Sequence, residues 1–502
     1  MARSFGALLA LSLTTLAHAE VRYVSASLTT GAGNGTSWAD AYRGPDALTV
    51  AIAASTAGDR LWVAAGRYTP TTTGDRAAAF IPKTGVTILG GFAGGETVES
   101  ARNPAVNVAL LTGDLAGNDD AWPRTTGRGE NSYHLFRATT TDASGTVDGF
   151  TLTGGNADTP GGGLDNDKGG AVLVLNGAAP SFIDCRMINN RSTFGGGAVY
   201  IRQSSPSFTD CKMTANNGGV YGGACDMATF CNPVWTRCRI EGNTAMRAGG
   251  VEVFGGSQPV FTNCLFAGNA STGSSQGTRG GGGLFIQQST VTVRNCTIAD
   301  NTSVFTGGGI LNNGGTVRVA NCILWNNRGP ENATAGQQLA GLTYTTLNCI
   351  VQDGFESGTG IITADPRFTS SAAGDYTLLA VSPAIDAGSN AELGGDTLDL
   401  ERRSRRIDDP RKADIGTGPA PVVDIGCFER PYLCPADMGG PGGLPGADGR
   451  LDNNDFVVFI DRFFSHTPEA DMGSTGGTPG ADGLFDNNDF VVFVEAFFTV
   501  CL

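Results

Sequence analysis

A block of about 26 residues recurs along the middle of the chain, from Pro180 to about Gly354. Each block contains a short apolar segment that ends in cysteine, and the steps between these cysteines are 26, 27, 26, 32, 26 and 27 residues. The cysteines are Cys185, Cys211, Cys238, Cys264, Cys296, Cys322 and Cys349. A fixed short period indicates identical structural units stacked on one another.

One period has room for two or three short strands and glycine turns, but its pattern contains no amphipathic helix. Stacked about 4.8 Å apart, equivalent strands pair into parallel sheets. The sequence therefore predicts an all-β fold, a right-handed parallel β-helix. The cysteines are expected to point inward as buried free thiols, because parallel neighbouring strands rarely give disulfide geometry.

An asparagine lies five positions after each of the first six cysteines. We expect these side chains to sit at a bend, where left-handed backbone suits asparagine, and to hydrogen-bond along the stack. The six are Asn190, Asn216, Asn243, Asn269, Asn301 and Asn327.

The two ends of the chain differ from the repeat. Residues 1–19 have the pattern of a signal peptide, with an apolar run followed by Ala17-His18-Ala19, so we expect export from Glu20 onward. Residues 20–430 are predicted to form the β-helix, with the repeat core at 180–354, and Pro45 to Ala54 a helix that covers its open N-terminal end. Residues 431–502 form a separate small module, and no segment predicts a membrane span.

The Phe-Thr-Asn-Cys264 and Gly-Gly-Ala repeats resemble those of the polymorphic outer-membrane-protein and pectate-lyase-like β-helix families. The resemblance covers Val21 to Glu429 and implies a fold rather than an activity. The segment from Asp365 to Glu429 is similar to the closing coils of bacterial surface β-helix proteins. Within it, Arg402 to Lys412 is interpreted as a solvated loop with acidic neighbours as counter-charges.

The C-terminal module contains the strongest chemical pattern of the sequence. An aspartate-rich loop that enters an apolar helical run is repeated 34 residues later, and its oxygens match the spacing of a calcium loop if a seven-residue Gly/Pro insertion loops out. The expected ligands are Asp437, Asp448, the Arg450 carbonyl, Asp452 and Asp455 in the first loop, and Asp471, Asp482, the Leu484 carbonyl, Asp486 and Asp489 in the second. The alternative is a pair of solvated acidic turns in which Asp455 and Asp489 only cap helices.

The paired loops and helices resemble dockerin modules, which implies bound calcium and a cohesin-like or cell-wall anchoring partner. Cys434 and Cys501 bracket the module and are expected to form a disulfide that closes it. Cys225 and Cys231 lie outside the ladder and could bridge a local loop.

A second charged pattern runs along the repeat. Asp184 and Asp210 should face outward on adjacent coils beside Arg237, with Arg186, Lys212 and Arg239 two residues further along. Such a ladder could bind a uronate, but the sequence favours an ordinary solvated face. The net charge of −15 argues against nucleic acid as a partner.

The sequence therefore predicts a secreted or cell-surface β-helix that presents a face to a polysaccharide or a surface protein and docks through a calcium module. Clustered histidines are missing from the mature sequence, which has only His134 and His466. A polysaccharide lyase or glycoside hydrolase is the alternative, and a structural surface-layer or adhesin protein is the third hypothesis. A cleft with three or more convergent carboxylates or Lys/Arg residues would favour the enzyme, and flat ladders would favour the binder.

Overall fold

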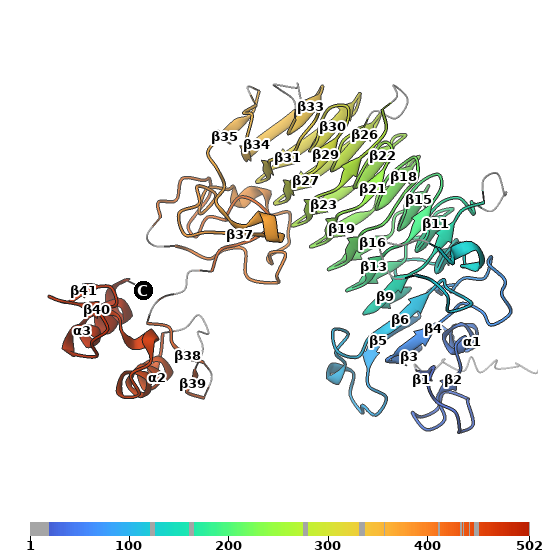
Figure 1. Cartoon of the computed structure of the whole chain (residues 1–502), viewed down its shortest axis with the longest axis horizontal. Helices are drawn as coiled ribbons and strands as arrows, with labels where there is room; N and C mark the ends of the chain where they lie inside the picture. The colour runs from blue at the N-terminus through green and yellow to red at the C-terminus, as the bar shows by residue number, and fades with distance from the viewer. Residues whose placement is uncertain are drawn as a thin grey trace, which may run out of the picture.

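The computed structural model describes residues 20–120, 126–159, 165–274, 280–330, 337–355, 357–409, 412–431, 434, 436–440, 442–445 and 451–500. The predicted signal peptide therefore lies outside the described residues. The chain forms a right-handed parallel β-helix, followed by a segment that folds back beside it and by a small helical tail (Figure 1). No helix in the described part of the chain is long and apolar enough to cross a membrane.

The strands stack into long parallel sheets, as predicted. The largest sheet contains β1 (Val21–Ser25), β2 (Tyr42–Arg43), β3 (Arg60–Ala64), β4 (Gly66–Tyr68), β5 (Thr87–Phe92), β6 (Ala109–Thr112), β8 (Thr146–Asp148), β9 (Phe150–Thr153), β12 (Ser181–Ile183), β13 (Arg186–Ile188), β16 (Ser207–Thr209), β17 (Lys212–Thr214), β19 (Val234–Thr236), β20 (Arg239–Glu241), β23 (Val260–Thr262), β24 (Leu265–Ala267), β27 (Thr290–Arg294), β28 (Thr297–Ala299), β31 (Thr316–Ala320), β32 (Ile323–Trp325), β34 (Tyr344–Val351) and β35 (Thr359–Ile362). A second sheet contains β7 (Phe136–Ala138), β11 (Val172–Leu175), β15 (Val199–Arg202), β18 (Cys225–Ala228), β22 (Val251–Phe254), β26 (Leu284–Gln287), β30 (Ile310–Asn313) and β33 (Leu339–Gly341). Short pairs at the remaining bend are formed by β10 (Asn156–Ala157) with β14 (Arg191–Ser192), and by β21 (Thr244–Ala245), β25 (Ala270–Ser271) and β29 (Thr302–Ser303).

The open N-terminal end of the stack is covered by a short helix, α1 (Ala47–Ala54). It begins two residues later than predicted and buries Ala47, Leu48, Ala51 and Ile52. These side chains belong to the same apolar core as the inward-facing strand residues. The helix thus shields core and strand edges that would otherwise meet water.

Identical positions on successive coils fall into register and fill the core. Phe182 pairs with Phe208, and Phe208 with Trp235, with ring centroids 5.3 Å and 4.0 Å apart. The seven ladder cysteines are buried free thiols, which confirms their predicted role as small apolar residues. Cys225 and Cys231 are also buried free thiols, so the local bridge considered for them is not formed.

The asparagine ladder forms a continuous hydrogen-bonded column inside the bend. The Asn243 Oδ1 accepts hydrogen bonds from both the backbone N–H and the Nδ2 of Asn216, at 2.9 Å and 3.0 Å. The Asn243 Nδ2 in turn donates to the Oδ1 of Asn269, at 3.0 Å. The column ends at Gln338, whose Oε1 accepts from the Asn327 Nδ2. All six asparagines are buried, so each amide satisfies backbone groups that water cannot reach.

Left-handed backbone occurs next to the ladder residues rather than at them, which corrects the prediction. The residue before each ladder cysteine has φ between 46° and 57°, and we call these seven positions the corner residues. They are Asp184, Asp210, Arg237, Asn263, Asn295, Asn321 and Asn348. Each turns the chain sharply between two strands, a conformation that asparagine and aspartate tolerate better than most residues.

The segment after β35 does not add closing coils, contrary to expectation. It forms an antiparallel hairpin, β36 (Phe368–Ser370) with β37 (Asp375–Leu378), and then runs back beside the solenoid (Figure 1). We call residues 387–403 the strap. It lacks the periodic cysteine and asparagine that allow a coil to stack, and it binds the corner residues instead.

The strap is bound to one corner residue after another in reverse order. The Asn321 side chain donates to the Ser389 carbonyl and accepts from the Ser389 N–H, at 2.9 Å and 2.8 Å. The Asn295 Nδ2 donates to the Glu392 carbonyl, and the Asn263 Nδ2 to the Leu398 carbonyl at 2.7 Å. Amide side chains at the corner thus replace the strand pairing that the strap cannot make.

The arginine-rich segment from Arg402 to Lys412 is only partly the solvated loop that the sequence indicated, because Arg402 and Arg406 are exposed but Arg405 is not. Arg405 is completely buried and donates to the carbonyls of Gly426 and Asp424, at 2.9 Å and 2.7 Å. Its Nε lies 3.7 Å from a carboxylate oxygen of Glu429, which is also buried. The acidic residues expected as solvated counter-charges are partly internal as well, since Asp399 accepts backbone hydrogen bonds from Glu401 and Arg403.

We expect Asn243→Ala to destabilise the β-helix by roughly 2–4 kcal/mol, because it leaves the buried N–H groups of Asn216 without an acceptor. Urea unfolding followed by circular dichroism measures this loss. Asn313→Ala is the matched control, since Asn313 is exposed at the end of β30 and should change stability by less than about 0.5 kcal/mol. Equal effects of the two substitutions would show that the column does not stabilise the stack.

Candidate functional site: a charged cleft at the end of the strap

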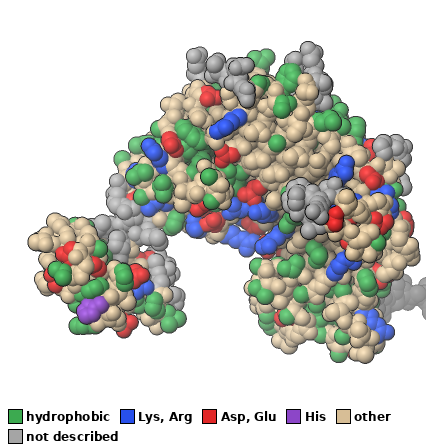
Figure 2. All heavy atoms as spheres, in the orientation of Figure 1, with side chains coloured by type: hydrophobic (Ala, Val, Ile, Leu, Met, Phe, Trp, Pro, Cys, Tyr) green, Lys and Arg blue, Asp and Glu red, His purple; other side chains and the backbone are tan. Residues whose placement is uncertain are grey.

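A cleft of about 310 Å³ opens where the strap ends, between the strap and a loop of the N-terminal coils. Its floor is made by the first corner residues and the strands that follow them, and its walls include Pro104, Ala105, Glu401 and Arg402. All six residues of the predicted charged ladder line it, namely Asp184, Arg186, Asp210, Lys212, Arg237 and Arg239. Figure 2 shows basic and acidic side chains gathered in the hollow beside the strap.

The ladder is therefore not the ordinary solvated face that the sequence favoured, because its six residues line a cleft. The strap covers the later corner residues and ends before Asp184, so the first corner positions become the floor of a cleft. Glu401 and Arg402 were missed as wall residues because the strap has no repeat from which its position could be inferred. The cleft residues are drawn from segments more than 200 positions apart in the sequence.

Three basic residues stand in register along the floor. Arg186 pairs with Lys212, and Lys212 with Arg239, on adjacent parallel strands. Neighbouring strands of this kind lie about 4.8 Å apart, so the three cations form a row with a regular spacing. The row begins after Thr151 and ends before Leu265, and it thus spans three coils.

Most charges in the cleft are already neutralised. Asp210 binds Arg237 at 2.7 Å and Arg402 at 3.2 Å, and Arg237 also binds Asp396 at 2.8 Å. These pairs fix the corner and the end of the strap in place. They leave little capacity on Asp210 or Arg237 for a ligand.

Two charged groups of the cleft remain available. Within the described residues, Arg186 is exposed and forms no ion pair, and Asp184 forms neither an ion pair nor a side-chain hydrogen bond. Burial raises the pKa of Asp184, and the nearby Arg402 offsets this only in part. Arg239 is held loosely, at 3.7 Å from Glu401 and 3.9 Å from Glu241, whereas Lys212 binds Glu241 at 2.8 Å. The cleft therefore offers unpaired positive charge beside a carboxyl group that is easier to protonate than usual.

The only histidine of the solenoid is not part of this site. His134 is buried, and its Nδ1 donates to the Gly169 carbonyl at 2.9 Å. Burial lowers its pKa to about 4, so the ring is neutral at physiological pH. It is a structural residue rather than a general acid or base.

In the tail, the two ends of the second predicted calcium loop, at Asp471 and Asp482, lie next to each other. The insertion loops out as a hairpin of β40 (Gly473–Ser474) and β41 (Thr478–Pro479), and Asp471 accepts hydrogen bonds from the N–H groups of Asp482 and Gly483. In the first loop, β38 (Gly439–Gly440) and β39 (Leu444–Pro445) form the same hairpin, whereas Asp448 and Arg450 lie outside the described residues.

Four of the predicted ligands act as caps in this structure. Asp455 and Asp489 are buried in the first turns of α2 (Asn453–Phe464) and α3 (Asn487–Glu495), and each accepts one backbone N–H from the N-cap residue and two from the preceding hairpin. Asp452 and Asp486 are the N-caps of these helices. Among the described residues of the tail, no three carboxylates lie close enough together to share an ion.

The tail has a small core of its own. Aromatic side chains of its two helices pack together, with the Phe459 and Phe493 ring centroids 3.9 Å apart. A π-helical turn, Ala496–Val500, follows α3. Cys434 is disulfide-bonded, and its predicted partner Cys501 lies outside the described residues.

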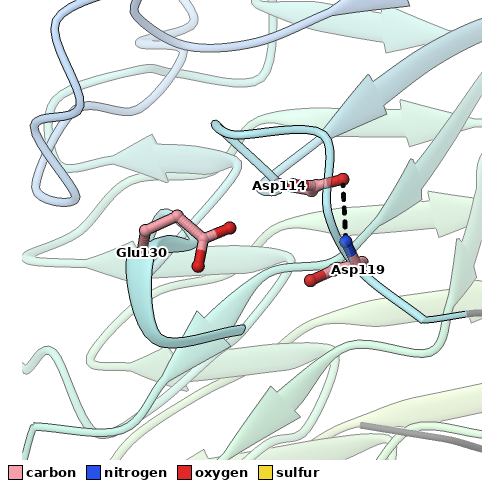
Figure 3. Close-up of side chains that lie close together, drawn as sticks. All are labelled: Asp114, Asp119 and Glu130. Atoms are coloured by element: carbon pink, nitrogen blue, oxygen red, sulfur yellow. Dashed lines mark hydrogen bonds between the residues drawn. The ribbon is translucent and has the colours of Figure 1, made fainter. Parts of the chain in front are cut away.

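An acidic cluster lies outside the cleft, in a loop after β6. Carboxylate oxygens of Asp114, Asp119 and Glu130 come within 4.8 Å of one another, and the Asp119 N–H donates to Asp114 (Figure 3). Arg67 and Arg128 lie 3.3 Å and 3.8 Å from Asp114 and Asp119. Basic side chains thus already offset part of this charge.

Comparison with protein-family models identifies the same fold. Residues 170–351 match the family model described as a right handed beta helix region, which is about a third of the chain. No curated protein matches it. Similar solved structures include the pectate lyase Pel9A (16% identity, TM-score 0.43, covering 83% of this chain and 98% of that one) and a rhamnogalacturonan lyase (14%, 0.42, 69% and 85%).

A third similar structure is PfbA, a surface adhesin of Streptococcus pneumoniae, with 11% identity and a TM-score of 0.28, covering 61% of this chain and 80% of that one. At these identities the similarity concerns the fold, and it says nothing about the cleft. The strands in register and the matching family model show that the chain is a right-handed parallel β-helix protein.

Proposed function

We propose that the chain is a secreted or cell-surface β-helix protein that binds an acidic polysaccharide in the cleft at the end of the strap. The observation that carries this proposal is the row of Arg186, Lys212 and Arg239, of which Arg186 has no partner in the described part of the chain. Five basic and three acidic residues line the cleft, although the whole chain has a net charge of −15. A local excess of positive charge in an acidic protein favours a negatively charged ligand.

The regular spacing of the row favours a polymer over a small anion. A chain of uronate residues carries one carboxylate per sugar, and it could lie along the coils with successive carboxylates near successive cations. Arginine also recognises carboxylates through two parallel hydrogen bonds, which adds geometric selectivity to the charge. The open cleft suits a polymer that extends past both of its ends.

A polysaccharide lyase or glycoside hydrolase acting in the same cleft is the second candidate. It is favoured by Asp184, a carboxyl with raised pKa beside the unpaired Arg186, which could move a proton while the arginine neutralises a uronate. More than three Lys/Arg residues line the cleft, which is the arrangement expected of an enzyme. Binding has more support because Asp210, the obvious second carboxylate, is held by two arginines.

We expect Arg186→Ala to weaken the binding of polygalacturonate about tenfold, because it removes a charge-assisted contact that no other group replaces. Isothermal titration calorimetry of the full chain measures this change. Arg191→Ala is the matched control, since Arg191 is an exposed arginine of the same coil that does not line the cleft. Wild-type binding should also weaken with added salt.

Equal affinities of the Arg186→Ala and Arg191→Ala proteins would contradict the proposed cleft, as would equal binding of polygalacturonate and a neutral polysaccharide. The same samples decide between binding and cleavage. New reducing or unsaturated ends that appear with the wild type and disappear with Asp184→Asn would establish the enzyme. Binding without new ends would leave the protein a binder.

We also propose that the tail is a docking module that binds calcium and attaches the protein to a cohesin-like or cell-wall partner. The hairpins support this idea, because they loop out the insertion and bring Asp471 beside Asp482. Several aspartates in each loop repel one another without a counter-ion, and a hard cation would relieve this repulsion.

In the full chain, calcium should slow amide hydrogen exchange in α2 and α3, and Asp448→Ala combined with Asp482→Ala should abolish this effect. The metal is expected to add folding free energy to a domain whose own core is small. Hydrogen exchange read by mass spectrometry gives the result segment by segment, with the β-helix strands as an internal reference. Identical exchange of both helices in calcium and in chelator would refute the calcium proposal and leave the aspartates as caps.

A further inference from the structure

Three carboxylates meet at the beginning of the strap, outside the tail and its predicted calcium loops. One carboxylate oxygen each from Asp386, Asp408 and Asp414 lies within 4.8 Å of the other two. Asp386 is completely buried, whereas Asp408 and Asp414 are exposed. The cluster thus has one internal ligand group and an open side towards solvent.

The buried carboxylate has no hydrogen-bond partner on either oxygen. The backbone of Asp386 is nevertheless anchored by hydrogen bonds. The Asp386 N–H donates to Asp424 at 2.8 Å, and its carbonyl accepts from the N–H groups of Ile415 and Gly416, both at 3.0 Å. The main chain is therefore held firmly with the unsatisfied carboxylate aimed at Asp408 and Asp414. Buried polar atoms without a partner are rare in proteins and often indicate an ion or water.

No basic side chain neutralises the cluster in the described residues. None of the three aspartates forms an ion pair, because Arg405 is bound to Glu429 and backbone carbonyls, and Arg430 to Asp409. Without a counter-ion the cluster destabilises the folded state, because a buried carboxylate is repelled by the like charges beside it.

We propose that Asp386, Asp408 and Asp414 hold one divalent cation, and that this cation is calcium. Three carboxylates supply between three and six oxygens, and water on the open side can complete the shell of a cation that accepts irregular geometry. The ligand set contains no histidine or cysteine, which disfavours zinc and copper.

The cation would join side chains of three segments, two of which are already linked by backbone hydrogen bonds. Asp386 immediately precedes the strap, Asp408 follows the buried Arg405, and Asp414 begins the turn whose Ile415 and Gly416 bind the Asp386 carbonyl. The far end of the strap forms one wall of the cleft. A cation at this point would therefore hold the cleft wall from a distance, without touching a ligand in the cleft.

The test is a count of bound calcium ions per full-length chain, by equilibrium dialysis with radioactive calcium at saturation. Asp408→Asn combined with Asp414→Asn should bind one ion fewer than the wild type, whatever the number held by the tail. Both residues are exposed, so the variant should fold, and unchanged circular dichroism checks this. Asp353→Asn combined with Asp365→Asn is the control, because it removes two exposed carboxylates that belong to no cluster.

Hydrogen exchange supplies the second measurement. Calcium should slow exchange across residues 387–403 in the wild type and in the control, but not in the Asp408→Asn, Asp414→Asn protein or in Asp386→Asn. An unchanged ion count in the cluster variant would overturn the proposal. An equal loss in the control would also overturn it, because the effect would then come from surface charge in general.

Discussion

The left-handed corner residue before each ladder cysteine is the feature on which the rest of the structure depends. It turns the chain between two consecutive strands of the largest sheet in each of these coils, and it places one side chain per coil on the outside of the bend. Where these side chains are asparagines, the strap binds them through its backbone. At Asp210 the end of the strap binds through Arg402, and beyond it the Asp184 corner is left uncovered, so one repeated backbone conformation produces both the docking track and the cleft.

The stack could be predicted from the sequence because its information is periodic. Cysteine, asparagine and apolar residues recur at one spacing, and parallel in-register pairing is the arrangement that buries all of them together. The strap could not be predicted, because its contacts with Asn263 and Asn321 join segments far apart in the chain and follow no repeat. The adjacency of the six charged residues of the ladder could be predicted from the same period, whereas the cleft that the strap forms around them could not.

The buried polar groups of the regular coils differ from those of the irregular strap region. At the bend of the repeat, buried neutral amides satisfy one another in a column, and the buried Glu252 of the second sheet is paired with Arg247. In the strap region the chain instead buries ionisable groups such as Arg405, Glu429 and Asp386, where they organise loops without regular strands. Arg405 and Glu429 neutralise each other, whereas Asp386 has no such partner, which is why a cation is proposed there and not along the coils.

The most direct test of the account is a crystal structure of the full chain grown with an oligogalacturonate and calcium. The account predicts the oligosaccharide in the cleft at the end of the strap, with sugar carboxylates within hydrogen-bond distance of Arg186 and Lys212 and the strap in the position described here. A sugar bound on another face of the solenoid, or a strap displaced from the corner asparagines with the cleft absent, would contradict it.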